Sequence, residues 1–315
     1  MKDNYETATP PEKLAESRSE RERLLQKWGF EPLSLMWITK IHDKNLDVIV
    51  EDTLAQGSYE KSNYNVRDGA LPQSSPIVAE RLIKFYTEPG DTVLNPMCER
   101  LPHLLIAHYL HRNVIGQDIC KEFYLHDVEK VKKRIKNAQF MDSENNKITF
   151  EDDNHFFSIY NGLRFDLTCG DSRHLDLPNN SIDFIITSPP YYNIGIYGDI
   201  EPEQIGRGTI TGKGDVPTYE EFLDGLQEIY AECLRVLKPG HFFCSILNDF
   251  RLKGRFYLFH IDSIHKAEQL GFIPHDLIIY NLGLHPIHAI FLSELNENKT
   301  FAKMHEYIEI FRKPN

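Results

Sequence analysis

From residue 76 to the end of the chain, short apolar runs alternate with longer stretches whose apolar residues recur at helical spacing. Pro76–Tyr86 has the helical pattern, and the turn residues of EPGD separate it from the apolar run Thr92–Leu94. The same alternation predicts later strands at Val114–Ile119, Arg164–Cys169, Ile182–Thr187, His241–Leu247, Leu277–Tyr280 and Tyr307–Arg312. It also predicts three further helices: one at Leu101–Leu110, one that follows the strand Val114–Ile119 and ends at Lys136, and one at 218–236. This order is typical of an α/β fold with a doubly wound, mostly parallel sheet and right-handed crossovers.

Such a fold has two consequences for the arrangement of the strands. The sheet should be one parallel-rich sheet with a single antiparallel strand near the C-terminus and helices on both faces. Thr92–Leu94 and Ile182–Thr187 should be neighbours in it and should end at one cleft.

The chain divides by pattern into an N-terminal extension, residues 1–70, and a main domain, residues 71–315. Residues 12–30 are rich in helix formers but carry only a narrow apolar stripe, so the extension is predicted to be helical. Within the main domain, segments 137–162 and 194–217 are polar and rich in turn residues, which is typical of inserted loops.

Composition narrows the compartment but not the activity. No apolar stretch is long enough for a membrane span, and the polar N-terminus is unlike a signal peptide. The five cysteines are scattered without a CxxC pair, which disfavours a metal site or disulfide framework and indicates a reducing cytoplasm. The net charge of −12 does not indicate a nucleic-acid binder, yet a local basic groove can lie on an acidic body.

The residues directly after the predicted strands carry the chemistry, because ligands bind beyond the carboxyl ends of parallel strands. The run T-S-P-P-Y-Y follows the apolar strand I-D-F-I-I and has no ready structural explanation. Two prolines remove two backbone donors and fix φ, so the neighbouring carbonyls lack local N–H partners. Carbonyls beside a hydroxyl and an aromatic face suit an exocyclic amino group on a planar ring. The turn therefore predicts a site for such a group.

TSPPYY resembles the catalytic motif of the N4-cytosine and N6-adenine DNA methyltransferases. The order of the other segments is also similar to that family from about residue 70 onward: SSPIVAERLIKFYTEPGDTVLNP, RNVIGQDI, LTCGDSRHLDLPNNSIDFII, YEEFLDGLQEIYAECLRVLKPGHFFCSI and KMHEYIEIFRKP. The resemblance implies the seven-stranded Rossmann-like sheet of S-adenosyl-L-methionine-dependent methyltransferases, with the cofactor half first. It also implies DNA as the substrate and a restriction-modification setting.

The same resemblance assigns roles residue by residue. Ser188 and the Pro189 carbonyl would bind the target amino group, and Tyr191 would stack on the flipped base. Asp118 would accept hydrogen bonds from the cofactor ribose, and Asp171 from its adenine amino group. The remaining implied positions are Pro190 in the catalytic turn, Ser75 and Pro76 near the methionine moiety, and Asn95 and Pro96 in the cofactor loop.

The cofactor loop departs from the family. The family's D-P-F-x-G-S-G-T corresponds here to N-P-M-C-E-R-L-P, a register fixed by the 23 positions between Asn95 and Asp118. Glu99 and Leu101 replace both glycines, which normally let the backbone approach the cofactor and turn sharply. We expect both side chains to fill that space and the Glu99 carboxylate to oppose the methionine carboxylate of the cofactor, so that cofactor binding is weakened. Pairing of Arg100 with the cofactor's carboxylate would offset part of the Glu99 charge, but such a rescue is the less favoured interpretation.

Three functions remain open at this point. The first is an active DNA amino-methyltransferase that acts without a metal or a covalent intermediate. The second is a catalytically silent relative that binds DNA or a partner, which the altered loop favours. The third is methylation of RNA or of a protein glutamine, which Ser188 disfavours. Few basic residues, among them Arg207, Lys213, Arg251 and Arg255, lie in the expected recognition loops, so a second subunit or a homodimer is predicted to help bind DNA.

Overall fold

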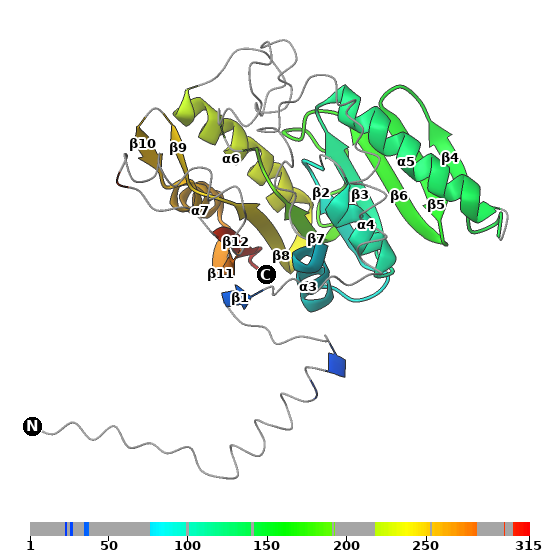
Figure 1. Ribbon diagram of the computed structural model, residues 1–315, viewed down its shortest axis with the longest axis horizontal. Coiled ribbons are helices and arrows are strands. Elements are labelled where there is room, and N and C mark those ends of the chain that lie inside the picture. Colours follow the sequence, from blue (N-terminus) through cyan, green and yellow to red (C-terminus); the bar gives the residue numbers. More distant parts are fainter. Residues whose placement is uncertain are drawn as a thin grey trace, which may run out of the picture. The chain divides into compact units, whose positions relative to one another are not determined.

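The structure is a computed structural model of the chain (Figure 1). It describes residues 76–98, 101–139, 142–190, 192, 218–252, 254–281 and 305–315, and in addition residues 23, 26–27, 35–37 and 299. By internal contacts the chain forms two units, Met1–Leu33 and Ser34–Asn315. The second unit contains the whole sheet.

Seven strands form the centre of one large sheet, in the order β6-β3-β2-β7-β8-β12-β11. Their bounds are β2 Thr92–Asn95, β3 Asn113–Asp118, β6 Leu163–Cys169, β7 Ile182–Thr187, β8 Leu237–Leu247, β11 Ile273–Asn281 and β12 His305–Arg312. The pairs from β6 through β8 are all parallel, and β12 is antiparallel to both of its neighbours. The predicted doubly wound, mostly parallel sheet with one antiparallel C-terminal strand is confirmed, as is the pairing of β2 with β7.

Additional strands extend the sheet at both edges. At one edge, β4 (Lys147–Glu151) and β5 (His155–Tyr160) form an antiparallel hairpin that continues from β6. At the other edge, β1 (Leu35–Trp37) pairs in parallel with β11. The inserted loop predicted at 137–162 is therefore corrected: the described part of this segment is the end of a helix followed by this hairpin. Turn residues at both ends of two short strands hid the pairing from a local reading of the sequence.

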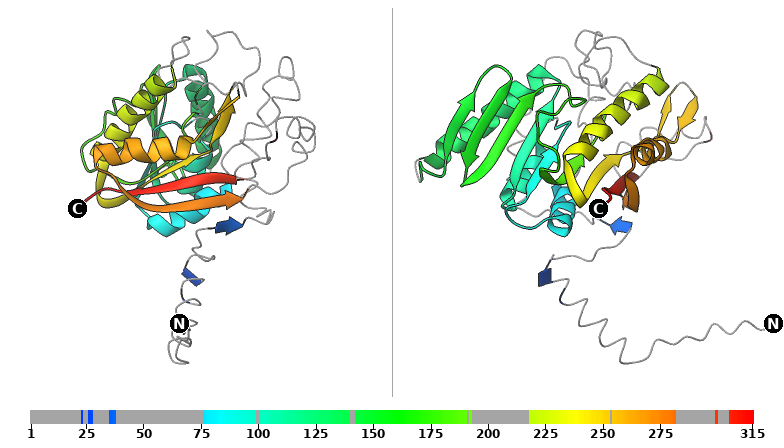
Figure 2. Two further views of the ribbon diagram at one scale, coloured as in Figure 1. Left: turned by 90° about the vertical axis from the view of Figure 1, so that its left-hand side faces the viewer. Right: turned by 180° about the vertical axis from the view of Figure 1, so that it is seen from behind.

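Helices cover both faces of the sheet (Figure 2). They are α3 Pro76–Tyr86, α4 Pro102–Tyr109, α5 Lys121–Gln139, α6 Tyr219–Val236 and α7 Phe259–Leu270. Helices α3, α4 and α5 pack over one hydrophobic cluster, and α6 and α7 over a second on the opposite face. A capping box starts α6, because the Thr218 hydroxyl accepts from the Glu221 N–H while the Glu221 carboxylate accepts from the Thr218 N–H.

The side chain of Leu104 on α4 packs directly against Gly116 of β3, where a larger residue would not fit. A Cβ atom at Gly116 would lie 2.5 Å from Leu104 Cδ1 and 2.9 Å from Leu167 Cδ2. This close packing holds the first turn of α4 against β3, next to the segment where the cofactor loop was predicted.

The predicted N-terminal extension, residues 1–70, is described at few positions. Arg23, Gln26 and Lys27 are helical, and Leu35–Trp37 form β1. The boundary at residue 70 stays a prediction, and segment 194–217 lies outside the described residues. Among the helices that the structure describes, none is long and apolar enough to cross a membrane.

Candidate active site

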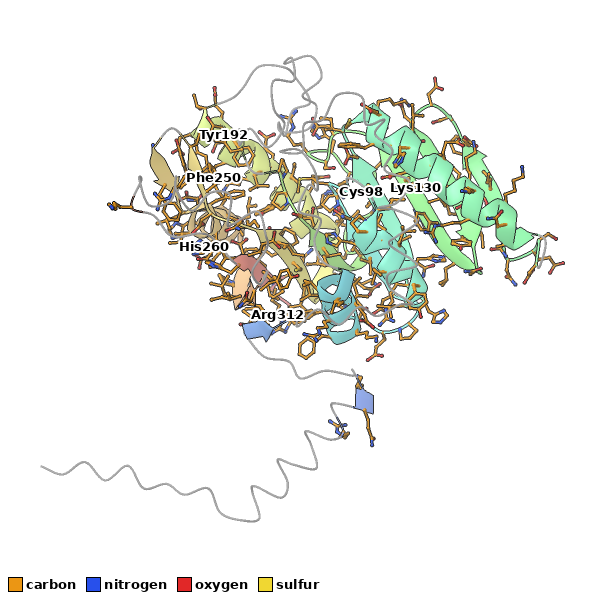
Figure 3. The ribbon with its side chains drawn as sticks, in the orientation of Figure 1. Cys98, Lys130, Tyr192, Phe250, His260 and Arg312 are labelled. Atoms are coloured by element: carbon orange, nitrogen blue, oxygen red, sulfur yellow. The ribbon has the colours of Figure 1, made fainter. Side chains whose placement is uncertain are left out.

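The carboxyl ends of four neighbouring parallel strands meet at one edge of the sheet. Asn95 ends β2, Asp118 ends β3, Asp171 follows β6, and Ser188 follows β7. Figure 3 marks this edge by Cys98, in the loop after β2, and by Tyr192, at the far end of the turn after β7. Topology thus brings together the predicted cofactor and catalytic segments, which are distant in sequence.

The turn Ser188-Pro189-Pro190 leaves a strand that is buried along its whole length. Pro189 is buried, whereas Ser188 and Pro190 are half-buried and so reach the surface at this edge. Neither proline carries an N–H, and the chain after β7 therefore cannot extend the sheet by further donors. Tyr191 lies outside the described residues, and its predicted stacking role stays a prediction.

The start of the cofactor loop is tied down by hydrogen bonds. Asn95 is 2% exposed; its Nδ2 lies 3.1 Å from His103 Nδ1, and its Oδ1 accepts from the Met97 N–H at 3.2 Å. Burial lowers the pKa of His103 to about 4, so its ring is neutral and Nδ1 can accept. The Pro96 carbonyl accepts from the Ser172 hydroxyl, which joins this loop to the segment after β6.

The Leu101 side chain is buried in the hydrophobic core, whereas it was expected to project into the space that a glycine leaves for the cofactor. Its side chain is 0% exposed and belongs to the hydrophobic cluster with Cys98 and Leu104. Its backbone is left-handed, with φ 65°, and its N–H donates to the Cys98 carbonyl at 3.0 Å as α4 begins. The loop thus keeps a backbone conformation that favours glycine while the leucine side chain turns into the core. Glu99 and Arg100 lie outside the described residues.

Asp118 is 8% exposed at the end of β3. Its Oδ1 accepts from the Cys120 N–H at 2.8 Å, just before α5, and its carbonyl accepts from the Gly170 N–H at 2.9 Å. The carboxylate therefore stabilises the start of a helix in the manner of a cap. Its predicted role at the ribose is compatible with this contact, since a carboxylate has several acceptor positions.

Asp171 is held by an arginine that the sequence reading missed. Arg173 donates from Nε to both oxygens at 3.0 Å, and its Nη2 lies 2.6 Å from Oδ2. Burial acts to raise the pKa of Asp171, but the hydrogen bonds from Arg173 outweigh it and the pKa is lowered. Arg173 also reaches Glu228 on α6 at 3.3 Å. The Asp-x-Arg spacing was the available signal for this pair.

Some of the other predicted positions lie outside the described residues. Ser75 lies outside the described residues, and Pro76 is the first residue of α3. Arg207 and Lys213 also lie outside them. Arg251 and Arg255 lie on the antiparallel hairpin of β9 (Phe250–Leu252) and β10 (Arg255–Tyr257), directly after β8.

A buried polar row lies in the sheet beneath the catalytic turn. Thr187, Ser245 and Glu309 are register partners across β7, β8 and β12, and each is at most 1% exposed. The Ser263 hydroxyl donates to Glu309 Oε2 at 2.7 Å, and the Tyr230 hydroxyl lies 3.0 Å from both serine hydroxyls. Burial raises the pKa of Glu309 well above its ordinary value.

Comparison with known proteins agrees with this geometry. A family model described as DNA methylase, for N6 and N4 methylation, matches residues 182–315, which include the catalytic turn. The chain is 32% identical over 160 residues to type II methyltransferase M.BglII of Bacillus subtilis, covering 50% of this chain and 36% of that protein. It is 32% identical over 111 residues to type II methyltransferase M.MjaVI of Methanocaldococcus jannaschii, covering 35% of this chain and 50% of that protein.

A solved structure is also similar over part of the chain. TTHA0409 of Thermus thermophilus, described as a putative DNA modification methylase and solved in complex with S-adenosyl-L-methionine, aligns with 26% identity and a TM-score of 0.34, covering 46% of this chain and 54% of that one. This chain spans between about a third and half of the curated relatives it matches. The resemblance to the amino-methyltransferases, read from TSPPYY and the surrounding segments, is confirmed by the matched family model and relatives.

Proposed function

We propose that this chain transfers a methyl group from S-adenosyl-L-methionine to an exocyclic amino group of DNA, at N4 of cytosine or N6 of adenine. The observation that carries the proposal is the position of Ser188-Pro189-Pro190. This turn follows β7 directly beside β2, and it lies within the segment matched by the DNA methylase model. The turn supplies oxygen acceptors and no backbone donors from its prolines, which suits an amino group as ligand.

The described residues fit the cofactor. Asp118 ends β3 beside β2, and Asp171 follows β6 beside β3, so two carboxylates are available for the hydroxyl and amino donors of a nucleoside. The Leu101 side chain leaves the loop surface, because it is fully buried in the core. When bound, S-adenosyl-L-methionine would supply an electrophilic methyl group on a sulfonium. Asn95, Pro96, Asp118 and Asp171 would hold it, with Ser75 and Pro76 near its methionine end.

The chain's own groups would act on the target base. The Ser188 hydroxyl and the Pro189 carbonyl would each accept a hydrogen bond from the target amino group, which raises electron density on the nitrogen and orients its lone pair. Tyr191 would stack on the flipped ring and hold it in place. A serine hydroxyl is too weak a base to keep the proton that the methylated nitrogen releases. Ser188 would therefore relay this proton to solvent.

DNA would approach through the loops around Arg207–Lys213 and the hairpin that carries Arg251 and Arg255. A second subunit or a homodimer would add phosphate contacts, since the chain's net charge of −12 opposes a polyanion. The five cysteines are free thiols, which suits action in the cytoplasm. Sedimentation of the protein with and without DNA would measure the oligomeric state.

The test is direct detection of the product. The purified protein is incubated with unmethylated, PCR-amplified bacterial DNA and S-adenosyl-L-methionine carrying a deuterated methyl group, and the DNA is digested to nucleosides. Mass spectrometry should find deuterated N4-methylcytosine or N6-methyladenine with the wild type and far less with Ser188→Ala. A wild-type sample without either labelled base, over a range of salt and protein concentrations, would refute the proposal.

A further inference from the structure

The residue that ends the catalytic turn is fixed in an unusual way. Tyr192 lies two positions after Pro190 in the sequence. Its φ is 42°, in the left-handed region that tyrosine seldom adopts. It is half-buried. A backbone in this region persists where surrounding contacts hold it, which directs attention to what the ring touches.

The Tyr192 ring lies in a cluster of aromatic side chains from three other elements. Its centroid is 5.4 Å from Tyr219 and 5.5 Å from Phe222 on α6, and 6.2 Å from Phe250 on β9. A further ring, Tyr257 on β10, lies at 6.3 Å. Figure 3 shows Tyr192 beside Phe250 at the same end of the molecule. These distances fall within the range in which aromatic pairs attract one another.

The cluster is a firm anchor because its other members are themselves held. Phe250 and Tyr257 are cross-strand partners in the β9–β10 hairpin and stack at 4.9 Å. Phe222 is 1% exposed in the core beneath α6. The Tyr219 hydroxyl donates to Asp262 on α7 at 2.7 Å. The cluster therefore joins the hairpin, α6 and α7 into one support.

The turn is thus held at both ends. At its start, Thr187 is 0% exposed and pairs with Ser245 in the sheet. At its end, the Tyr192 ring packs in the aromatic cluster. Between them, two prolines fix φ and leave few free dihedral angles. We propose that Tyr192 is a positioning residue, which holds the Ser188 hydroxyl and the Pro189 carbonyl in the geometry that binds the target amino group.

The support also carries positive charge. On the same hairpin, the Arg251 guanidinium lies 4.6 Å from the centre of the Phe256 ring, and Arg255 lies 4.7 Å from that of Tyr257. Cation–π contacts of this kind hold the guanidinium groups in place while leaving N–H donors for phosphate. A DNA strand bound at these arginines would therefore be held by the same rigid group that fixes the catalytic turn. This consequence rests on the proposed function, whereas the anchoring of the turn does not.

Hydrogen–deuterium exchange of the full chain tests the anchoring without any need for activity. Tyr192→Leu removes the ring but keeps an apolar side chain, and Tyr192→Phe keeps the ring. Tyr109→Leu on α4 is the control, because Tyr109 is 48% exposed and has no place in the site. Peptides that cover the turn should exchange at least ~5-fold faster in Tyr192→Leu, while those from β7 and β8 are unchanged, in line with local opening. Tyr192→Phe and Tyr109→Leu should match the wild type.

Tyr257→Leu is a second variant, which removes another ring from the same cluster in case Tyr192→Leu unfolds. It should speed exchange of the turn in the same direction. Unchanged exchange of the turn in both leucine variants would overturn the proposal. This holds whether or not the wild type methylates DNA.

Steady-state kinetics then separate positioning from binding, with PCR-amplified bacterial DNA as the probe. Tyr192→Leu should lower kcat by an order of magnitude or more, because small misplacements of reacting groups are costly, and should leave KM for DNA nearly unchanged. Tyr192→Phe should restore kcat. A Tyr192→Leu enzyme with wild-type kcat would contradict the inference. A wild type that methylates nothing would refute the proposed function alone, since exchange still decides the anchoring.

Discussion

The left-handed Leu101 gives a sharp test of the loop that enters α4. Its side chain is fully buried, and its φ of 65° is unfavourable for any residue with a Cβ atom. A truncation at this position therefore changes two energies of opposite sign. Comparison of alanine with glycine separates them, because both remove the leucine side chain but only glycine removes the Cβ atom.

The size of each effect follows from the surroundings. Loss of a fully buried leucine side chain costs roughly 2–5 kcal/mol of unfolding free energy, including the cavity left behind. At an ordinary helical position, glycine is about 1 kcal/mol less stable than alanine. At a left-handed position the order reverses, because the backbone strain of roughly 1–2 kcal/mol is relieved. Leu104 provides the comparison, since it is also 0% exposed and packs in the same cluster within α4.

Urea unfolding of Leu101→Ala, Leu101→Gly, Leu104→Ala and Leu104→Gly measures the four free energies. We expect all four variants to be less stable than the wild type. We also expect glycine to be more stable than alanine at Leu101 by about 1 kcal/mol, and less stable than alanine at Leu104 by a similar amount. The same order at both positions would show that Leu101 is not left-handed in solution.

The same variants test the direction of the Leu101 side chain. Because this side chain lies inside the core, calorimetric titration with S-adenosyl-L-methionine should give equal affinity for Leu101→Gly and the wild type. A Glu99→Gly variant is expected to bind more tightly, by about a factor of ten or 1.4 kcal/mol, if the carboxylate opposes the cofactor. A tenfold gain from Leu101→Gly alone would contradict the buried position.

Further outcomes are expected at the catalytic turn, in the core and on the hairpin. In the labelled-methyl assay, Ser188→Ala should cost ~10²-fold in rate, and Tyr191→Ala should lose about 1–3 kcal/mol of base stacking; equal product from Ser188→Ala and wild type would remove that hydroxyl from the mechanism. Burial raises the pKa of Glu309 above its ordinary 4.5, so the folded state holds this proton to a higher pH than the unfolded state does. The free energy of unfolding should therefore fall as pH rises above 4.5, and urea unfolding should show a smaller fall for a Glu309→Gln variant. Arg251→Ala with Arg255→Ala should weaken DNA binding in a filter assay and reduce its salt slope by about 1–2, and an unchanged slope would exclude phosphate contacts there.

Much of the fold was predictable because the central strands are apolar and short. Ile182–Thr187 is buried at every position, and a mostly apolar run of this length, interrupted here by Asp183 and bounded by turn residues, is typical of a central parallel strand. Once strand order is known, the edge that holds Asn95, Asp118 and Ser188 follows, since parallel strands end together. The candidate site residues were therefore predicted from their position after strands as well as from the family resemblance, and the structure brings the described ones to one edge of the sheet.

Three features could not be predicted from the sequence, because they depend on contacts that form only in the folded chain. Every residue of β4 is exposed, so Lys147–Glu151 has no burial pattern, and its pairing with β5 exists only in the folded sheet. The aromatic side chains that surround Tyr192 come from segments 219–222 and 250–257, which no local pattern joins. The contact between Arg173 and Asp171 also depends on a turn geometry that the sequence alone leaves open.

The described ends of the altered cofactor loop are held by contacts that need no glycine. The loop is held by the Ser172 hydroxyl on the Pro96 carbonyl and by the Cys98 N–H on the Gln117 carbonyl at 3.0 Å. These bonds involve no glycine, and they fix the chain before it reaches position 101. The backbone there turns left-handed, and the leucine side chain contributes burial that offsets the strain. Replacement of the second glycine is thus not by itself evidence for a silent protein, and titration of Glu99→Gly with cofactor tests whether the charge at position 99 limits binding.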